Sequence, residues 1–257
     1  MSYLKYLYDS VATLPPVVLA ILGVWLLGMV LLPILRWTVG EKAIPGGISV
    51  TVLLQTAAAV AVLGTAWGPV SVGAAVLLVP LCGWLVEFLG SKTGFPFGDY
   101  SYTKALQPQI GDVPVIIPIA WLMMAPAAWA VADAILPDGH LVLRAIIAGA
   151  AFTAWDLYLD PQMVGWGFWR WHKKGRYFGI PLVNFFGWFL AAGVMSLVVG
   201  VTVGGLAVPT GPLLVMYVLT WLLQGFAQAV FWRMPATAAF GFVGMGVFAV
   251  VALLRAV

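Results

Sequence analysis

The stretch Pro15–Leu35, PPVVLAILGVWLLGMVLLPIL, decides the fold of this chain because it is a long apolar run without a single charged residue. A helix of about 20 apolar residues crosses a hydrocarbon core about 30 Å thick. The run is also longer than the apolar core of a secretory signal, and no small-residue cleavage site follows it. We therefore expect it to be retained as a membrane span, at about 15–37.

Seven further apolar runs of similar length follow along the chain, at about 47–67, 69–89, 114–136, 141–160, 181–203, 209–232 and 235–255. Of the 257 residues, 63% are hydrophobic and 8% charged, whereas about a quarter of the residues in soluble domains are charged. The runs lack the polar–apolar alternation of a membrane β-barrel. We predict an all-α polytopic membrane protein with about eight transmembrane helices in one bundle, and residues 1–257 forming a single domain.

The positions of Lys and Arg predict the orientation, because cytoplasmic loops carry the excess of positive charge. With eight spans, the two termini and the even-numbered loops share one face, which holds Lys5, Arg144 and Arg255. The other face holds Arg36, Lys42, Lys92, Lys104, Arg170, Lys173, Lys174, Arg176 and Arg233. We therefore expect a multi-pass protein of the cell membrane, with the long connections 90–113 and 161–180 in the cytoplasm and both termini outside.

Ionisable side chains inside predicted spans point to function, because they are costly in a membrane. Glu87 lies near the end of the third span, Asp156 and Asp160 lie one helical turn apart near the end of the fifth, and Asn184 begins the sixth. Residues four apart share one helical face. Because successive spans run in opposite directions, we predict that these side chains and Gln228 meet at one depth, in the cytoplasmic third of the membrane.

Four tryptophans fall in the same slab and complete what we interpret as a lined cavity: Trp84, Trp121, Trp155 and Trp188. An interfacial belt is the alternative for these indoles. The aspartate pair also has an alternative, as a helix-end pair held by Arg170, Lys173 or Arg176, with Asp160-Pro161 stopping the helix. Gln224 and Gln228 fit hydrogen bonds between helices. We interpret Asp133 as a surface acid.

Several function classes find no support in the sequence. The last three spans contain no lysine for a retinal Schiff base, and the chain has no phosphate loop and no dinucleotide fingerprint. No paired His and Cys spacing suggests a metal, so we predict neither metal nor cofactor. The net charge of +3 gives no case for nucleic acid, and Cys82 is the single cysteine.

The two long connections and their flanks carry a family resemblance. The string EFLGSKTGFPFGDYSY (87–102) resembles the signature of the membrane carotenoid 1,2-hydratases, the type that acts on gamma-carotene or bisanhydrobacterioruberin. Three further strings resemble the same family: VPVIIPIAW (113–121), WDLYLDP (155–161) and YFGIPLVNFFGW (177–188). The resemblance covers about residues 83–190, the middle of the chain.

This resemblance implies a reaction that adds water across the terminal C1=C2 double bond of an acyclic carotenoid end and gives a tertiary alcohol. It implies no redox cofactor. The expected partners are a carotenoid that enters from the bilayer and membrane lipids, with other carotenoid enzymes as further candidates. A membrane carotenoid cyclase, which also begins with protonation, is one alternative, and a carotenoid or lipid transporter is another.

Alkene hydration needs an acid, a stabilised cation and a held water, and we assign residues on that basis. One of Asp156 and Asp160 would be the acid, kept protonated by burial among apolar groups. The other, or Glu87, would orient and deprotonate water. The water would be positioned by Asn184 and by Tyr100 or Tyr102, and the cation would face Trp84, Trp121, Trp155 and Trp188. The loop Gly94–Tyr102, with Asp99, would cap the end group, and a packed re-entrant turn is the alternative for this loop.

Overall fold

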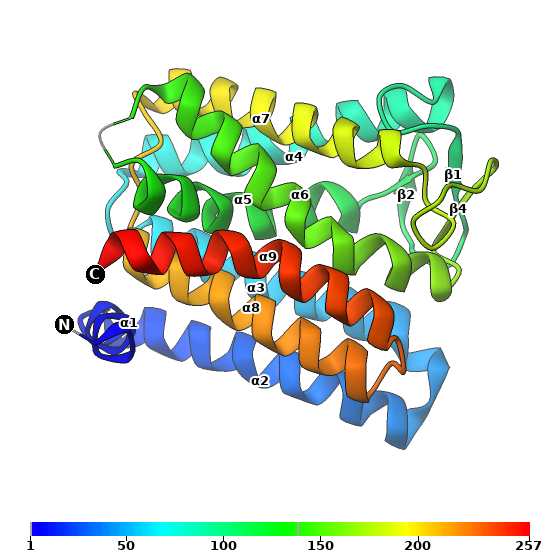
Figure 1. The fold of residues 1–257 in the computed structure, drawn as a ribbon, viewed down its shortest axis with the longest axis horizontal. Coiled ribbons are helices and arrows are strands. Elements are labelled where there is room, and N and C mark those ends of the chain that lie inside the picture. Colours follow the sequence, from blue (N-terminus) through cyan, green and yellow to red (C-terminus); the bar gives the residue numbers. More distant parts are fainter. Residues whose placement is uncertain (1, 138) are drawn as a thin grey trace.

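The computed structural model describes residues 2–137 and 139–257, and in this part of the chain it is a bundle of long helices (Figure 1). The helices are α1 (Tyr3–Ala12), α2 (Pro16–Val39), α3 (Ile44–Leu63), α4 (Pro69–Thr93), α5 (Ile116–Ile135), α6 (Leu141–Gly165), α7 (Leu182–Val203), α8 (Thr210–Val230) and α9 (Pro235–Ala256). The 3₁₀ turn η1 (Glu41–Ala43) leads into α3. Among the described residues, eight helices, α2 to α9, are long and apolar enough to cross a membrane, which confirms the predicted fold class.

The two chain ends lie together at one end of the bundle, and the long connections lie at the other (Figure 1). This is the arrangement that an even number of spans requires. Which of the two ends faces the cytoplasm stays a prediction.

Helix α5 forms the centre of the bundle. It packs against α3, α4, α6, α8 and α9, and most of its residues are buried. Many of these residues are alanines, and small side chains let neighbouring helices approach closely. Helices α6 and α7 approach closely at Gly149, where an added Cβ would lie 2.8 Å from the carbonyl oxygen of Phe189.

The two long connections are joined by a short sheet. Strand β1 (Tyr100–Tyr102) of the first connection pairs antiparallel with β4 (Trp169–Trp171) of the second. A second pair, β2 (Gln109–Ile110) and β3 (Val113–Pro114), forms a hairpin beside it. The β1–β4 pairing ties together segments far apart in the sequence, and it was not among the sequence-based expectations.

Helix α6 does not stop at Asp160-Pro161, as one interpretation of the sequence held, but continues to Gly165. A proline inside a helix leaves the carbonyl four residues earlier without its usual N–H donor. Here that carbonyl belongs to Leu157, and the Tyr177 hydroxyl donates to it over 2.9 Å. A hydrogen bond from the second connection thus replaces the missing one.

Two further features differ from the sequence-based picture. Asp133 is not a solvated surface acid, because its carboxylate pairs with the buried Arg144 and accepts a hydrogen bond from Thr210. Arg144 also donates to the Leu206 carbonyl over 2.9 Å. In addition, the chain begins with the short helix α1, which was not expected and which packs against α8.

Candidate functional site

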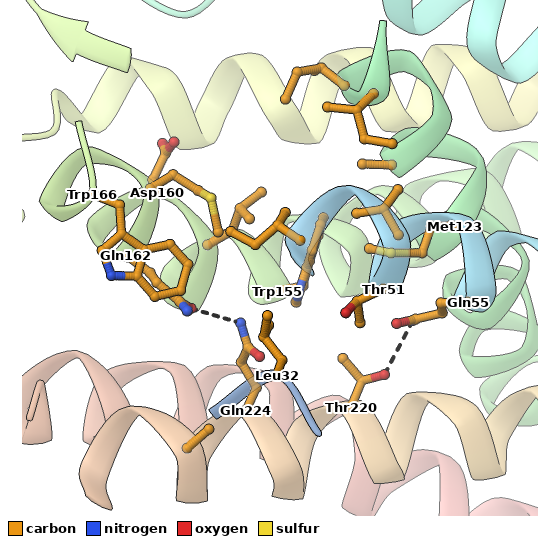
Figure 2. Close-up of a pocket in the computed structure, with 18 of the residues that line it drawn as sticks. Leu32, Thr51, Gln55, Met123, Trp155, Asp160, Gln162, Trp166, Thr220 and Gln224 are labelled. Carbon is orange, nitrogen blue, oxygen red and sulfur yellow. Dashed lines mark hydrogen bonds between the residues drawn. The ribbon is translucent and has the colours of Figure 1, made fainter. Parts of the chain in front are cut away.

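A cavity of about 390 Å³ lies between α2, α3 and α8 on one side and α4 to α7 on the other. Most of its lining is aliphatic or aromatic, and Figure 2 shows the part around Trp155 and Trp166. Three of the side chains predicted to act on substrate face this space from different helices: Glu87, Asp160 and Asn184. The predicted convergence of polar groups is therefore present.

The Glu87 carboxylate is buried and accepts three hydrogen bonds. The hydroxyls of Tyr100 and Tyr102 donate to its Oε2 over 2.5 and 2.7 Å, and the Trp121 indole donates to its Oε1 over 3.2 Å. Gly90, one turn after Glu87, makes room for this loop, since an added Cβ there would lie 3.1 Å from the Tyr100 hydroxyl.

The two tyrosines are held in their protonated, donating form. Burial is the largest cause that raises the pKa of Tyr100 and of Tyr102 well above its usual value, and the adjacent Glu87 carboxylate adds to it. Both phenols therefore keep their protons at neutral pH and remain donors to Glu87. The Glu87 carboxylate is thus surrounded by three groups that act as donors to it.

The second carboxyl group at the cavity belongs to Asp160. The Trp169 indole donates to its Oδ1 over 2.9 Å, and the Asn184 amide donates to its Oδ2. The same amide nitrogen donates to Asp156 over 2.9 Å. Asp156 does not reach the cavity, so the two aspartates have different positions: Asp160 faces the cavity, and Asp156 lies behind it.

In the described part of the chain no Lys, Arg or His forms an ion pair with Glu87, Asp156 or Asp160. The alternative of a helix-end pair held by basic loop residues therefore has no support in the structure. Asp156 even keeps a buried oxygen, Oδ1, without a hydrogen-bond partner. Buried charges without counter-ions cost several kcal/mol each. Two carboxylates that share one site do not both ionise, so we expect Asp156 and Asp160 to keep one proton between them.

The strand pair β1–β4 couples the two carboxyl groups. In its register Tyr100 lies opposite Trp171, and Tyr102 lies opposite Trp169. The phenols that bind Glu87 and the indole that binds Asp160 therefore sit on two strands of one small sheet. Displacing either connection would disturb the hydrogen bonds of both carboxyl groups.

Aromatic rings form the wall beside the carboxyl groups. Trp121 and Trp188 stack with their centroids 4.8 Å apart, and Phe152 stacks on both. Trp155 meets Trp188 edge-on at 6.4 Å. Three of the four predicted tryptophans thus lie together at the cavity, where ring faces attract a positive charge.

Two predicted site residues lie elsewhere. Trp84 stacks on Phe88 and donates to the Ile110 carbonyl over 3.1 Å, so the β2–β3 hairpin holds it on the outer side of α4. Asp99 is exposed, 4.0 Å from the His172 ring. Gln228 also differs from its prediction, because it bonds to Tyr158 and Gln162 rather than to the carboxyl groups.

Sequence reasoning missed two of the residues at this site. Trp169 holds Asp160, but its place in a basic loop gave no sign of that contact, which depends on the β1–β4 pairing. Gln162 also lines the cavity. Its two-residue spacing from Asp160 puts the side chains on opposite flanks of α6, so a search for residues that share a face passed over it.

The cavity opens sideways between α2 and α8. Trp37 of α2 and Phe226 of α8 line it, yet 66% and 57% of their surfaces are exposed. At the loop end, Arg36 closes the gap by donating to the Phe231 carbonyl over 3.1 Å. Deeper in the bundle, Gln55 links α2 and α3 to α8, accepting from Trp25 over 3.2 Å and donating to Thr220 over 3.3 Å.

These features define a polytopic membrane protein with a cluster of carboxyl groups inside an apolar, indole-lined cavity. The chain belongs to the family described as carotenoid biosynthesis protein, whose model matches residues 47–253. This membership confirms the resemblance found in the long connections.

One curated relative is named bisanhydrobacterioruberin hydratase and comes from Haloarcula japonica. It is 30% identical over 128 residues, which is 49% of this chain and 43% of the relative. The match thus spans less than half of the relative's length. No solved structure matches the chain.

Proposed function

We propose that this protein is a hydratase that adds water to the terminal C1=C2 double bond of an acyclic carotenoid. The observation that carries the proposal is the pair of carboxyl groups, Glu87 and Asp160, facing an apolar cavity walled by indoles. The family membership and the name of the Haloarcula japonica relative support the same chemistry.

In the proposed reaction Asp160 is the acid. It faces the cavity, and it shares the Asn184 amide with a second buried carboxyl group, Asp156. Like charges that close do not both ionise, so the pair keeps a proton available. The π electrons of the alkene take this proton at carbon 2, and carbon 1 becomes a tertiary cation.

The aromatic wall stabilises that cation. The rings of Trp121, Trp155 and Trp188 lie beside the carboxyl groups, and a ring face that meets the cation contributes about 1–2 kcal/mol when water is excluded. The wall also keeps bulk water away, so that the cation meets a single held water molecule rather than solvent.

Glu87 is the base in this scheme. Its anionic form accepts hydrogen bonds from Tyr100, Tyr102 and Trp121. Water bound beside it attacks carbon 1 and gives up one proton to Glu87, which completes the tertiary alcohol. The enzyme is reset when that proton returns to Asp160, so the overall reaction consumes one water and nothing else.

The lateral opening between α2 and α8 gives the substrate a path. A carotenoid is almost insoluble in water, and a gap lined by Val30, Ile34 and Phe226 lets an apolar chain end slide in from lipid. We further propose that the end of the bundle with the long connections faces the cytoplasm of the cell membrane, because it carries most of the Lys and Arg residues.

The test is expression in cells that accumulate lycopene or gamma-carotene, followed by mass spectrometry of the extracted pigments. A product heavier by one water, absent with Asp160→Asn, is the expected result. A product of unchanged mass and altered retention identifies a cyclase instead. Unchanged pigments, with the protein present in the membrane, count against chemistry on these substrates and favour binding or transport.

A further inference from the structure

The segment 170–176, RWHKKGR, begins in β4 and carries every Lys and Arg residue of the second long connection. We call it the basic turn. Its two lysines and two arginines are exposed, and none of them forms an ion pair within the described residues. Asp99, 4.0 Å from the His172 ring, is the one acid within ion-pair distance of the basic turn in the described part of the chain.

The end of the bundle that holds the basic turn has a surplus of positive charge. It carries nine Lys and Arg residues. Within residues 2–137 and 139–257, the exposed acids at that end are Glu41, Asp99 and Asp112. Glu41 and Asp112 are already paired, with Arg36 and Lys92. The positive charge of the basic turn therefore calls for an anion from outside the chain.

The basic turn lies beside two membrane spans. Helix α6 ends at Gly165, shortly before the turn, and α7 begins at Leu182, shortly after it. The chain between the turn and the body of α7 exposes Phe178 and Leu182, by 43% and 61%. Anionic lipids attract Lys and Arg side chains that lie within about 8–10 Å of the membrane surface, and exposed apolar side chains beside them fit acyl chains. A lipid surface suits both features, whereas an acidic protein suits only the first.

The backbone holds the basic turn in one shape. Gly175 and Tyr177 form antiparallel bridges with Gly179 and Ile180, so the chain folds back on itself directly after the two lysines. An added Cβ at Gly175 would collide with the Ile180 carbonyl. A turn that is already ordered loses less conformational entropy on binding than a free segment does.

Strand β4 connects the basic turn to the carboxyl groups. Side chains alternate between the two faces of a strand. Trp169 and Trp171 line the cavity, whereas Arg170 between them is exposed. Trp169 donates to Asp160, and the paired strand β1, which lies beside β4 in Figure 1, supplies the two tyrosines that donate to Glu87. A contact that fixes Arg170 therefore also fixes the strand that holds Asp160.

We infer that the basic turn binds the headgroups of anionic phospholipids, and that this binding holds β4 where the site requires it. The four Lys and Arg side chains donate to phosphate oxygens, and Phe178 and Leu182 contact the acyl chains. The hydration rate then depends on the charge of the surrounding lipid. This dependence rests on the proposed hydratase function, whereas the lipid binding does not.

The binding experiment measures the melting temperature of the full chain in a neutral detergent with added short-chain phosphatidylglycerol or phosphatidylcholine. Saturating phosphatidylglycerol should raise the melting temperature by about 5 °C, phosphatidylcholine should raise it much less, and high salt should weaken the effect. Glycerol phosphate, the same headgroup without acyl chains, should have little effect. Equal stabilisation by glycerol phosphate identifies a site for free anions and overturns the lipid assignment.

A variant of the basic turn locates the binding. Combining Lys173→Gln, Lys174→Gln and Arg176→Gln removes three of its charges without touching the carboxyl groups or their donors. Each such charge contributes about fivefold to binding at an anionic surface, so half of the stabilisation should require at least about 10-fold more phosphatidylglycerol. Without lipid, this variant should melt close to the wild type, which shows that it folds.

The matched control removes three charges from other loops at the same end of the bundle, by combining Lys42→Gln, Lys104→Gln and Arg233→Gln. It should keep the wild-type response to phosphatidylglycerol. Equal losses in the two triple variants show that only the total charge matters, and they overturn the basic turn as the site.

The activity experiment compares initial hydration rates in nanodiscs of phosphatidylcholine and of a phosphatidylcholine–phosphatidylglycerol mixture. The wild type should be about 10-fold faster in the mixture, since a catalytic group displaced by about 1 Å can cost about 100-fold in rate. The turn variant should be slow in both lipids, and the control variant should behave as the wild type. Equal wild-type rates in the two lipids overturn the inferred hold on β4. Hydration in neither lipid overturns the proposed function, and the melting comparison still decides the lipid binding.

Discussion

Replacing Glu87 by glutamine tests proton transfer by this side chain with almost no change in its shape. Glu87 Oε1 accepts from the Trp121 indole, and Oε2 accepts from Tyr100 and Tyr102. An indole can only donate, whereas a phenol hydroxyl can also accept. The glutamine oxygen should therefore stay toward Trp121, and the new NH₂ group should turn toward the tyrosines, which rotate their hydroxyls to accept.

The expected effect on stability is small. The hydrogen bonds to Glu87 are charge-assisted, and each weakens by about 1 kcal/mol when the charge is removed. Against this, a buried carboxylate without a counter-ion carries a penalty of several kcal/mol, which the amide does not have. We expect the two effects to offset each other, so that the free energy of unfolding changes by about 1 kcal/mol or less.

The expected effect on activity is large. A positioned base contributes about 10²- to 10⁴-fold to a rate, which corresponds to about 3–5 kcal/mol in the barrier. The glutamine cannot take the proton from the attacking water, so the initial rate of hydrated product should fall by at least about 100-fold. Chromatography with mass detection measures the rate in membranes, and thermal unfolding in detergent measures the stability.

Trp84→Phe provides the control, because Trp84 lies one turn earlier on α4 but faces the β2–β3 hairpin instead of the cavity. It should leave the rate within about threefold of the wild type. If Glu87→Gln also stays within about threefold, the reasoning is refuted, and Glu87 is a structural acceptor for the two tyrosines.

Three other outcomes follow from the geometry. Asp160→Asn should lower the hydration rate by about 10²- to 10⁴-fold. Asp156→Asn should lower it by only about 10-fold, because Asp156 acts through Asp160. Equal losses in the rate assay would contradict this difference. Gly149→Ala should lower the free energy of unfolding by about 1–3 kcal/mol through overpacking of α6 on α7, seen as a lower melting temperature with unchanged product. Burial and Glu87 raise the pKa values of Tyr100 and Tyr102 above 10.0. Because the phenols of the unfolded chain lose their protons first, the free energy of unfolding should fall as the pH rises above about 10. Changing both tyrosines to Phe should make that fall less steep in melting curves.

Much of the fold could be predicted from the sequence because membrane spans are set by local composition. The eight predicted runs correspond to α2–α9, with boundaries shifted by a few residues. The convergence of Glu87, Asp160 and Asn184 followed from the alternating direction of the spans. Helix α1 escaped notice because it is too short and too polar to resemble a span.

The remaining features depend on contacts between distant segments. Neither Tyr100 nor Trp169 indicates alone that their strands pair, and without that pairing the partners of Glu87 and Asp160 cannot be identified. The position of Trp84 is decided by a hairpin that begins more than twenty residues later in the chain.

The gap between α2 and α8 has a consequence for how the reaction is measured. If substrate arrives only through the bilayer, its effective concentration is a mole fraction in the membrane rather than an amount per volume of buffer. Adding empty vesicles that fuse with the membrane should then slow turnover by surface dilution, although the total carotenoid is constant. The tertiary alcohol is more amphiphilic than the alkene, so the new hydroxyl would tend to draw the product end toward the headgroups and keep it from diffusing back.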